Sequence, residues 1–351
     1  MTTFRNADFH LNKPGTLIAA LPAVLGFVPE KSLVLVTLDD GEMGCVMRID
    51  LSVDVFDAVD RMAEVAAAAS PDAAIAVIVD EDAMTCRMCK DEHRQLADAL
   101  GDALSAWGID LLAAHVVDRV AAGGRWHCAD GRTCGGTVED PSASPMAAAA
   151  VLDGRRLYSR RADLQEVIAV ADPDRTVGLF DVIADAAPSS DADQRPDLEA
   201  RADVEHAMVA AAGAVEGRCP SDADLARLAY GLTDPRVRDT LYALAVGRDA
   251  ASAESLWALL ARTLPEPWRA EALVLLAFSA YARGDGPLAG LSLEAALRCD
   301  PEHRMAGMLD QALQSGMRPE QIRELGLTGY RLAKQLGVEL PPRQSFRRRA
   351  G

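Results

Sequence analysis

Apolar and polar positions over the first 140 residues alternate between strand-like and helix-like patterns. Short apolar runs, two of them joined by turn residues at 39–42, predict buried strands, and apolar positions at three- and four-residue spacing predict helices. Strands separated by helical crossovers indicate a partly parallel sheet with helices packed on it. We therefore expect a mixed α/β domain over residues 1–140. The predicted strands are 32–38, 44–51, 73–80 and 109–120, and the predicted helices are 14–24, 53–69 and 90–107.

The pattern changes after residue 140. Residues 141–196 have few strand signals and are rich in Ala, Asp and Pro, which predicts a helical linker region with a solvated loop at 188–197. Residues 197–338 predict one helix after another, so we expect an all-α domain; Asp234-Pro235 marks the start of one helix. Residues 339–351 predict a flexible basic tail.

Residues 268–303 carry the most regular helical pattern of the chain. Large and small apolar residues occupy the positions that a tetratricopeptide repeat uses to pack two antiparallel helices, and Gly284-Asp285-Gly286 falls at the turn. One hairpin cannot bury its apolar faces alone, so it must pack on neighbouring helices. Both an ordinary helical hairpin and a peptide-binding repeat fit this pattern. The positions are Leu273, Leu276, Ala277, Ala280, Ala289, Leu293, Ala296 and Pro301.

Composition narrows the classes of partner. Half of the 351 residues are apolar, so the chain can bury the cores of about two domains. Its 53 acidic residues against 36 basic ones give a net charge of −17, which disfavours general nucleic-acid binding because phosphates are repelled. The basic cluster of the tail is the local exception. It consists of Arg343, Arg347, Arg348 and Arg349.

The apolar run at 17–28 is long enough for the core of a signal peptide and too short to span a bilayer. Pro22 interrupts the run and no convincing cleavage site follows, so we expect a helix leading into a strand. Seven cysteines, an odd number in a long chain, do not indicate a secreted disulfide framework. We expect a cytoplasmic protein with no membrane span.

Two cysteine pairs have a spacing that a metal site could use. Cys86 and Cys89 form a C-x-x-C turn with two thiolates, and Cys128 and Cys134 lie in a Gly-rich loop after the next strand. Neighbouring strands bring such loops together, so these four cysteines could hold a structural zinc. Unlinked thiols, or a redox disulfide at the strand-to-helix junction, also fit the pattern. Substitute zinc ligands in the same segments are His93 and His127.

Acidic residues follow the ends of several predicted strands. Asp80 and Asp82 come directly after one strand, and Asp50 ends another. Active sites of open α/β sheets gather at the carboxyl ends of strands, where paired carboxylates can hold Mg²⁺ for phosphoryl chemistry. Solvated loop acids in an acidic chain fit equally well. Arg48 and Asp50 can also form a salt-bridged pair on an edge strand.

Several common catalytic motifs are absent from the sequence. It has no G-x-x-x-x-G-K-[ST], no G-x-G-x-x-G after a strand, no H-E-x-x-H and no G-x-S-x-G. This removes the usual signatures of nucleotide hydrolysis, dinucleotide binding, zinc proteolysis and ester hydrolysis. His115 lies inside a predicted buried strand and is expected to be a core histidine, and Trp126 and Trp268 are expected to be packing residues.

With these segments laid out, the chain resembles the actinobacterial domain-of-unknown-function family 4192. The resemblance implies an α/β part joined to a helical part and brings no catalytic residues with it. The family pattern often has cysteines in the segment matching 128–134, whereas a C-x-x-C at 86–89 is not part of it. The segments that carry the resemblance are 14–36, 48–50, 125–134, 147–164, 234–245 and 275–319.

These observations lead to two main hypotheses of function. The repeat-like helical surface and the lack of a catalytic motif favour a non-enzymatic protein that binds a protein partner or forms a homo-oligomer. The alternative is a metal-dependent hydrolase of a small phosphorylated molecule that uses Asp80, Asp82 and Asp50. A zinc-stabilised regulatory protein is a third reading.

Overall fold

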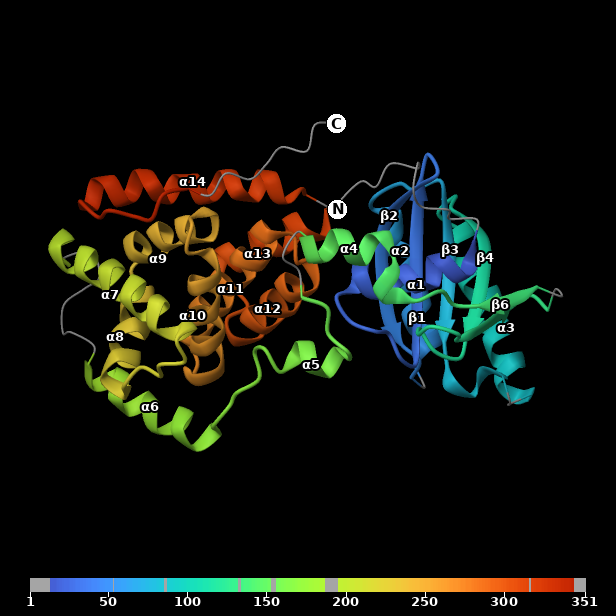
Figure 1. Cartoon of the computed structure of the whole chain (residues 1–351), viewed down its shortest axis with the longest axis horizontal. Helices are drawn as coiled ribbons and strands as arrows, with labels where there is room; N and C mark the ends of the chain where they lie inside the picture. Colours follow the sequence, from blue (N-terminus) through green and yellow to red (C-terminus); the bar gives the residue numbers. More distant parts are fainter. Residues whose placement is uncertain are drawn as a thin grey trace. The chain divides into compact units, whose positions relative to one another are not determined.

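The computed structural model describes residues 13–52, 54–84, 87–131, 134–152, 156–186, 195–315 and 317–343. The chain divides into two compact units, Met1–Leu164 and Gln165–Gly351 (Figure 1). The first unit contains a six-stranded mixed sheet with helices, and the second is helical. This confirms the expected fold class, an α/β part followed by an all-α part.

The first unit is built around one sheet with the strand order β2-β1-β3-β4-β5-β6. β3 and β4 are parallel and are joined by the crossover helix α3, whereas every other neighbouring pair is antiparallel. The bounds are α1 Pro14–Leu25, β1 Ser32–Asp39, β2 Glu42–Asp50, α2 Val55–Ala67, β3 Ala73–Val79, η1 Glu81–Met84, α3 Arg87–Ser105, β4 Asp110–Val117, β5 Arg125–Cys128, β6 Gly135–Thr137, η2 Pro141–Ala143, α4 Pro145–Leu152 and α5 Arg161–Gln165.

The central strands β1 and β3 are buried on both faces of the sheet, since their side chains point alternately to opposite sides and nearly all are buried. On one face, Leu33 of β1, Ile78 of β3 and Val116 of β4 share a core with the apolar stripes of α2 and α3. The residues that alternate with these along each strand, such as Val34 of β1 and Val77 of β3, are also fully buried and point to the opposite face. This explains why the strands of the sequence are continuous apolar runs.

Helix α1 lies on that opposite face. The Cβ-free backbone of Gly15 approaches the backbone oxygen of Thr137 and the indole of Trp126, so that a Cβ there would lie 2.4 Å from the Thr137 oxygen. Helix α1 also contacts α4, and Phe27 forms a β-bridge with Tyr158. Residues 141–164, which the sequence assigned to a linker region, therefore pack with the first unit.

The second unit contains helices that surround α11. Every residue of α11 from Ala270 to Ala282 is buried except Glu271, and α11 contacts α10, α12, α14 and η4. The bounds are α6 Pro173–Ala186, α7 Asp197–Val215, α8 Asp222–Leu232, α9 Pro235–Leu241, η4 Tyr242–Val246, α10 Ala250–Thr263, α11 Arg269–Arg283, α12 Gly286–Cys299, α13 Arg304–Gln314 and α14 Pro319–Leu336.

Helices α11 and α12 form the helical hairpin that the sequence indicates. Gly284 ends α11 in the left-handed region with φ of +90°, and the Asp285 carboxylate accepts a hydrogen bond from the Leu288 amide at 3.1 Å, which caps α12. The apolar positions expected to pack this hairpin are buried, except Pro301, which is exposed. Whether it belongs to the tetratricopeptide class stays a prediction.

Candidate functional site

The carboxyl ends of β2, β3 and β4 lie at the same end of the sheet. Ser32 of β1 pairs with Asp50 of β2 on one side and with Val79 of β3 on the other, and the Asp80 amide donates to the Val117 carbonyl oxygen at 2.9 Å. Asp50 and Asp80 thus lie at the same end of the sheet. The sequence predicted this placement, because the carboxyl ends of strands that run in the same direction meet at one end of a sheet.

Each of these carboxylates has partners of its own. Asp50 forms ion pairs with Arg48 and with Arg161, the latter at 3.3 Å, so the predicted Arg48–Asp50 pair on the edge strand β2 is confirmed. The Asp80 Oδ1 accepts a hydrogen bond from the Asp82 amide at 3.2 Å, and its Oδ2 lies 3.0 Å from Nε2 of His93. Asp50 and Asp80 are therefore oriented by different neighbours, and among the described residues the oxygens of the three aspartates do not converge as a metal site would require.

His93 links α3 to the end of β3. Its side chain is 7 % exposed and the Asp80 side chain is 15 % exposed, so their contact is shielded from water. The other ring nitrogen, Nδ1, is buried and has no hydrogen-bond partner among the described residues. This contact fixes the first turns of α3 over this end of the sheet.

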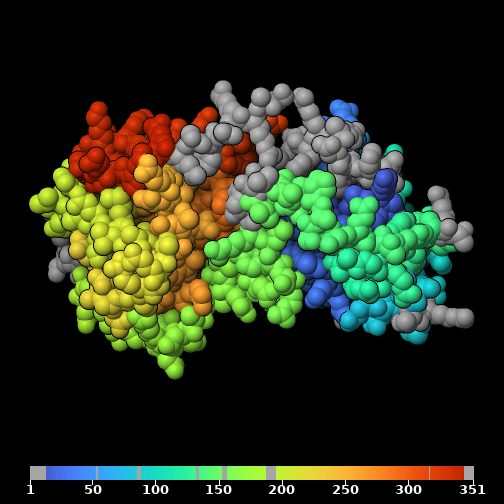
Figure 2. Space-filling model, viewed as in Figure 1, coloured from blue at the N-terminus to red at the C-terminus, as the bar shows by residue number. Residues whose placement is uncertain are grey.

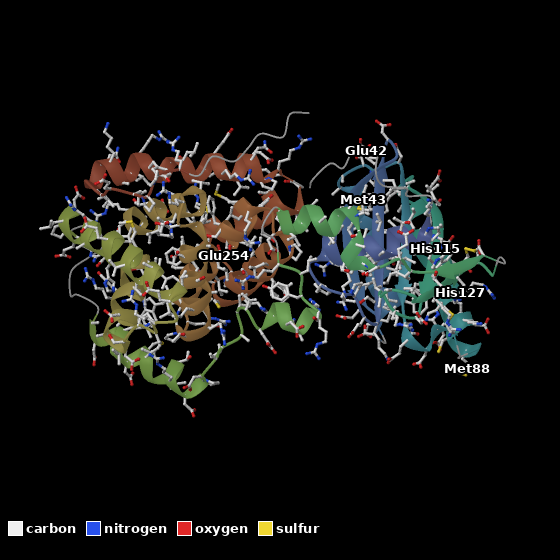
Figure 3. The ribbon with its side chains drawn as sticks, viewed as in Figure 1. Glu42, Met43, Met88, His115, His127 and Glu254 are labelled. Carbon is white, nitrogen blue, oxygen red and sulfur yellow. A yellow bond between two sulfur atoms is a disulfide. The ribbon has the colours of Figure 1, made fainter. Side chains whose placement is uncertain are left out.

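The cysteines of the predicted zinc site do not all come together. Cys128 and Cys134 are joined as a disulfide with their Cα atoms 5.8 Å apart. Cys89 is a half-buried thiol on α3, and Cys86 lies outside the described residues. In Figure 3 the disulfide is drawn beside His115, whereas Met88, the neighbour of Cys89, lies away from both.

The register of β4 and β5 explains this separation. Cys128 pairs with His115, and its Sγ lies 3.9 Å from Nδ1 of His115. Val116 and Ala129, the next residues of the two segments, belong to the core beneath α2 and α3. Cys128 and His115 therefore face away from α3, because neighbouring residues of a strand point to opposite sides.

In the part of the chain that the structure describes, one group of three metal-ligating side chains converges. Its members are Cys128, Asp130 and Cys134, whose ligand atoms all lie within 4.8 Å of one another. The group stands in the β5–β6 hairpin. Sequence analysis identified both cysteines but not Asp130, because an acid in a polar loop carries no distinctive signal.

Two histidines flank this hairpin on opposite faces of the sheet. His115 is 5 % exposed, and its ring lies edge-to-face with the Trp126 ring, with the ring centroids 5.2 Å apart. The expectation of a core histidine is therefore confirmed. Burial lowers the pKa of His115, and the charge of Asp130 opposes this. Burial also lowers the pKa of His127, together with the charges of Lys90 and His93 on α3.

The remaining cysteines have different surroundings. Burial raises the pKa of Cys45 on β2. Burial, together with a hydrogen bond to Glu266 at 3.2 Å, raises the pKa of Cys299 to about 11. Cys219 is exposed, with its Sγ 3.6 Å from a guanidinium nitrogen of Arg175.

A buried ionic network in the helical unit was not expected from sequence. Arg195 is 8 % exposed, bonds to the Asp203 carboxylate, lies 3.5 Å from Asp234 and covers the Tyr230 ring at 5.1 Å. Burial works against the charge of Arg195, but Asp203 and Asp234 outweigh it and raise its pKa. Arg195, Asp203 and Tyr230 line a pocket of about 320 Å³ with Glu199, Arg227 and neighbouring alanines.

Comparison with known proteins now places the chain. A family model described as "Domain of unknown function (DUF4192)" matches residues 14–320, which covers most of each unit. The chain belongs to the DUF4192 family. Comparison with the curated proteins gave no match, and comparison with the solved structures gave none either. The actinobacterial origin stays a prediction.

The helices show no membrane-spanning candidate. Across the described stretches, none of them combines the length with the apolar character that crossing a bilayer requires. The apolar run at 17–28 corresponds to α1 and the residues that follow it, and Leu17, Ile18 and Leu21 of that helix are fully buried within the first unit.

Proposed function

We propose that this DUF4192 chain is a non-enzymatic protein that assembles with a second copy of itself through helix α7. The observation that supports this proposal is the outer face of α7, where Leu198, Val209 and Val215 are 73 %, 70 % and 59 % exposed. The inner face of the same helix, with Val204 and Ala207, is buried. A surface helix normally keeps a polar outer face, and an apolar one indicates contact with another protein.

Exposed and half-buried residues of α7 are spaced so that they form one stripe, in which Ala202 and Glu205 are the half-buried members. Leu198, Ala202, Glu205, Val209 and Ala212 follow one another at alternating intervals of four and three residues, which places them on one side of the helix. The two alanines leave room for another helix to approach closely. Helix α7 is drawn in yellow-green at the surface of the helical unit (Figure 2).

The stripe is complementary to itself under two-fold symmetry. A two-fold axis through an antiparallel pair of α7 helices, placed midway between positions 198 and 209, sets Leu198 of each copy against Val209 of the other. The same symmetry sets Arg201 of each copy within reach of Glu205 of the other. These two residues already pair within one helix at 2.9 Å, so the seam brings opposite charges together rather than like charges.

The expected affinity is weak. Full burial of a Leu or Val side chain contributes roughly 1.5–3 kcal/mol, so four such side chains at the seam contribute about 4–8 kcal/mol when their present exposure is considered. Association costs about 4–15 kcal/mol in lost freedom of motion, so these four side chains leave at most about 4 kcal/mol, which corresponds to a dimer that forms near millimolar concentration. The net charge of −17 works against association over longer distances.

Size-exclusion chromatography with light scattering tests this proposal on the full chain. We expect twice the 37.3 kDa mass of one chain at high concentration and a return to 37.3 kDa on dilution. The double variant Leu198→Glu and Val209→Glu is expected to be monomeric. Val177→Glu on α6, at a position that is 74 % exposed, is the matched control and is expected to dimerise normally.

Two outcomes count against the proposal. A wild-type chain that stays monomeric up to the highest concentration that can be measured would remove self-assembly altogether. A dimer that persists in the double variant would remove α7 as its interface. Circular dichroism of each variant checks that the helical unit remains folded.

The location of the protein and the alternative enzymatic function remain to be considered. A cytoplasmic location belongs to the same proposal and rests on composition. The metal-dependent hydrolase that would use Asp50, Asp80 and Asp82 stays a prediction, and the partners described above for these carboxylates give it no support.

A further inference from the structure

Three side chains with metal-binding atoms converge in the β5–β6 hairpin, and a fourth, His115, lies beside one of them on the face of the sheet opposite α3. The ligand atoms of Cys128, Asp130 and Cys134 lie within 4.8 Å of one another, and Nδ1 of His115 lies 3.9 Å from Sγ of Cys128. Two sulfurs, one carboxylate oxygen and one imidazole nitrogen are a donor set that suits zinc. Figure 3 shows His115 next to the sulfur pair.

The strand pairing brings these residues together. His115 of β4 pairs with Cys128 of β5, which places the imidazole beside the first sulfur. His127 pairs with Gly135, so Cys128 and Cys134 are the next facing positions of the β5–β6 hairpin, with Cα atoms 5.8 Å apart. Asp130 stands in the connecting loop, just before Gly131 with φ of +75°. The β4–β5 ladder thus places His115 and Cys128, Cys134 directly precedes β6, and Asp130 stands in the connecting loop.

The distance between Sγ of Cys128 and Nδ1 of His115 agrees with tetrahedral coordination. Zinc–sulfur and zinc–nitrogen bonds of about 2.3 and about 2.1 Å at a tetrahedral angle put the sulfur and nitrogen roughly 3.6 Å apart. The Cys128–His115 distance of 3.9 Å is close to that edge length. His115 is 5 % exposed, and the register between β4 and β5 holds its ring beside Sγ of Cys128.

We propose that Cys128 and Cys134 in their reduced form, together with His115 and Asp130, hold one zinc ion. This site replaces the four-cysteine arrangement expected from the sequence, because Cys89 lies on α3, which covers the other face of the sheet. The site is separate from the α7 face and does not depend on the proposed self-assembly.

Zinc binding and the Cys128–Cys134 disulfide exclude each other, since the same two sulfurs are needed for both. A dithiol reductant breaks the Sγ–Sγ bond by exchange, gives two cysteine thiols and becomes a cyclic disulfide itself. Zinc then displaces the two thiol protons, which are released to the solvent. The hairpin thus has a covalently linked form and a metal-bound form, selected by the redox state.

The test uses the full chain without an affinity tag, reduced, stripped with a chelator and titrated with Co²⁺ and then with Zn²⁺. We expect one Co²⁺ per chain, with the visible bands of tetrahedral cobalt and a sulfur-to-cobalt charge-transfer band, and displacement of Co²⁺ by Zn²⁺. Cys128→Ser and Cys134→Ser should each weaken binding more than about 100-fold, beyond what loss of an outer-sphere contact causes. His115→Gln and Asp130→Asn should weaken binding and alter the cobalt spectrum.

Cys89→Ser is the matched control, since it removes another half-buried cysteine while leaving the proposed ligands in place. It should bind Co²⁺ as the wild type does. A wild-type level of binding in Cys128→Ser, or loss of binding in Cys89→Ser, would overturn the proposed ligand set.

A second measurement needs no variant and so does not depend on variant folding. The oxidised wild-type chain should bind no Co²⁺, and reduction should restore the site. In the reduced chain, Zn²⁺ should protect Cys128 and Cys134 from alkylation while Cys89 still reacts, as mapped by mass spectrometry. Equal binding before and after reduction, or protection of Cys89 instead of this pair, would contradict the inference.

Discussion

Asp234 holds the start of α9 and the centre of the buried ionic network at the same time. Its Oδ1 accepts a hydrogen bond from the Arg236 amide at 2.9 Å, which caps the helix, and its carboxylate contacts the guanidinium groups of Arg236 at 2.8 Å and Arg195 at 3.5 Å. The Asp234 side chain is 5 % exposed. Replacement by Ala removes both the cap and the charge, whereas replacement by Asn keeps a good cap and removes only the charge.

The expected loss in the free energy of unfolding follows from these contacts. Loss of an N-cap costs about 1 kcal/mol, and breaking a buried ion pair by removing one partner costs about 3–5 kcal/mol. Arg195 keeps Asp203 and Glu199 as partners, which limits the second contribution to its lower end. We expect Asp234→Ala to lower the free energy of unfolding by about 3–5 kcal/mol and Asp234→Asn to lower it by about 1 kcal/mol less.

Urea unfolding followed by far-ultraviolet circular dichroism at neutral pH measures these values. Asp197→Asn is the matched control, because Asp197 contacts the same Arg236 at 2.9 Å but its side chain is 75 % exposed, and an exposed pair contributes about 0–1 kcal/mol. If Asp234→Ala unfolds within about 1 kcal/mol of the wild type, or if Asn is as harmful as Ala, the account of the cap and the network is wrong.

The contacts of Asp234 also predict that the stability of the chain depends on pH. Burial tends to raise the pKa of Asp234, but hydrogen bonds and charge from Arg236, with the charge of Arg195, outweigh burial and lower it. A lowered pKa means that the contribution to stability is complete above the pKa of the unfolded chain, about 3.9, and is lost as pH falls through the folded value. The difference in stability between wild type and Asp234→Asn should therefore shrink below about pH 4.

Two further predictions concern helix packing and thiol reactivity. A Cβ at Gly329 of α14 would lie 2.7 Å from a backbone oxygen, so Gly329→Ala should destabilise the chain by about 1–3 kcal/mol in the same urea assay. A Cβ at Gly307 of α13 would have no atom within 4 Å, so Gly307→Ala should stabilise the chain by about 0.5–1 kcal/mol. The opposite order of the two variants would contradict the packing described. Timed alkylation near neutral pH should label the exposed Cys219 before Cys299, whose pKa is about 11, and Glu266→Gln should speed the labelling of Cys299; a Cys299 that reacts first would refute this order.

Local signals in the sequence were enough to predict much of the fold. The Asp234-Pro235 pair begins α9 and Gly247 follows the 3₁₀ helix η4, because a capping carboxylate and a proline at the first helical position act over a few residues. The Gly284-Asp285 turn between α11 and α12 has the same kind of local cause. The continuous apolar runs of β1 and β3 identified strands buried on both faces, and strand direction placed Asp50 and Asp80 at one end of the sheet.

The candidate site could be predicted only in part. Sequence spacing drew attention to Cys128 and Cys134 but joined them to Cys86 and Cys89, because spacing along the chain does not say which face of a sheet a side chain occupies. Nothing in the spacing could have added His115. Its pairing with Cys128 follows from the register between β4 and β5, which is set by the whole ladder.

The sequence by itself indicated most helices and strands to within a few residues, since caps, turns and apolar spacing act between residues that are close in the chain, but it did not indicate β5 or β6. Tertiary structure alone decided which side chains meet. Arg195 comes from a segment expected to be a solvated loop, yet packing of α7 and α8 buries it beside Asp203 and Tyr230. Such contacts depend on register and on packing between residues far apart in sequence, and no local pattern records them.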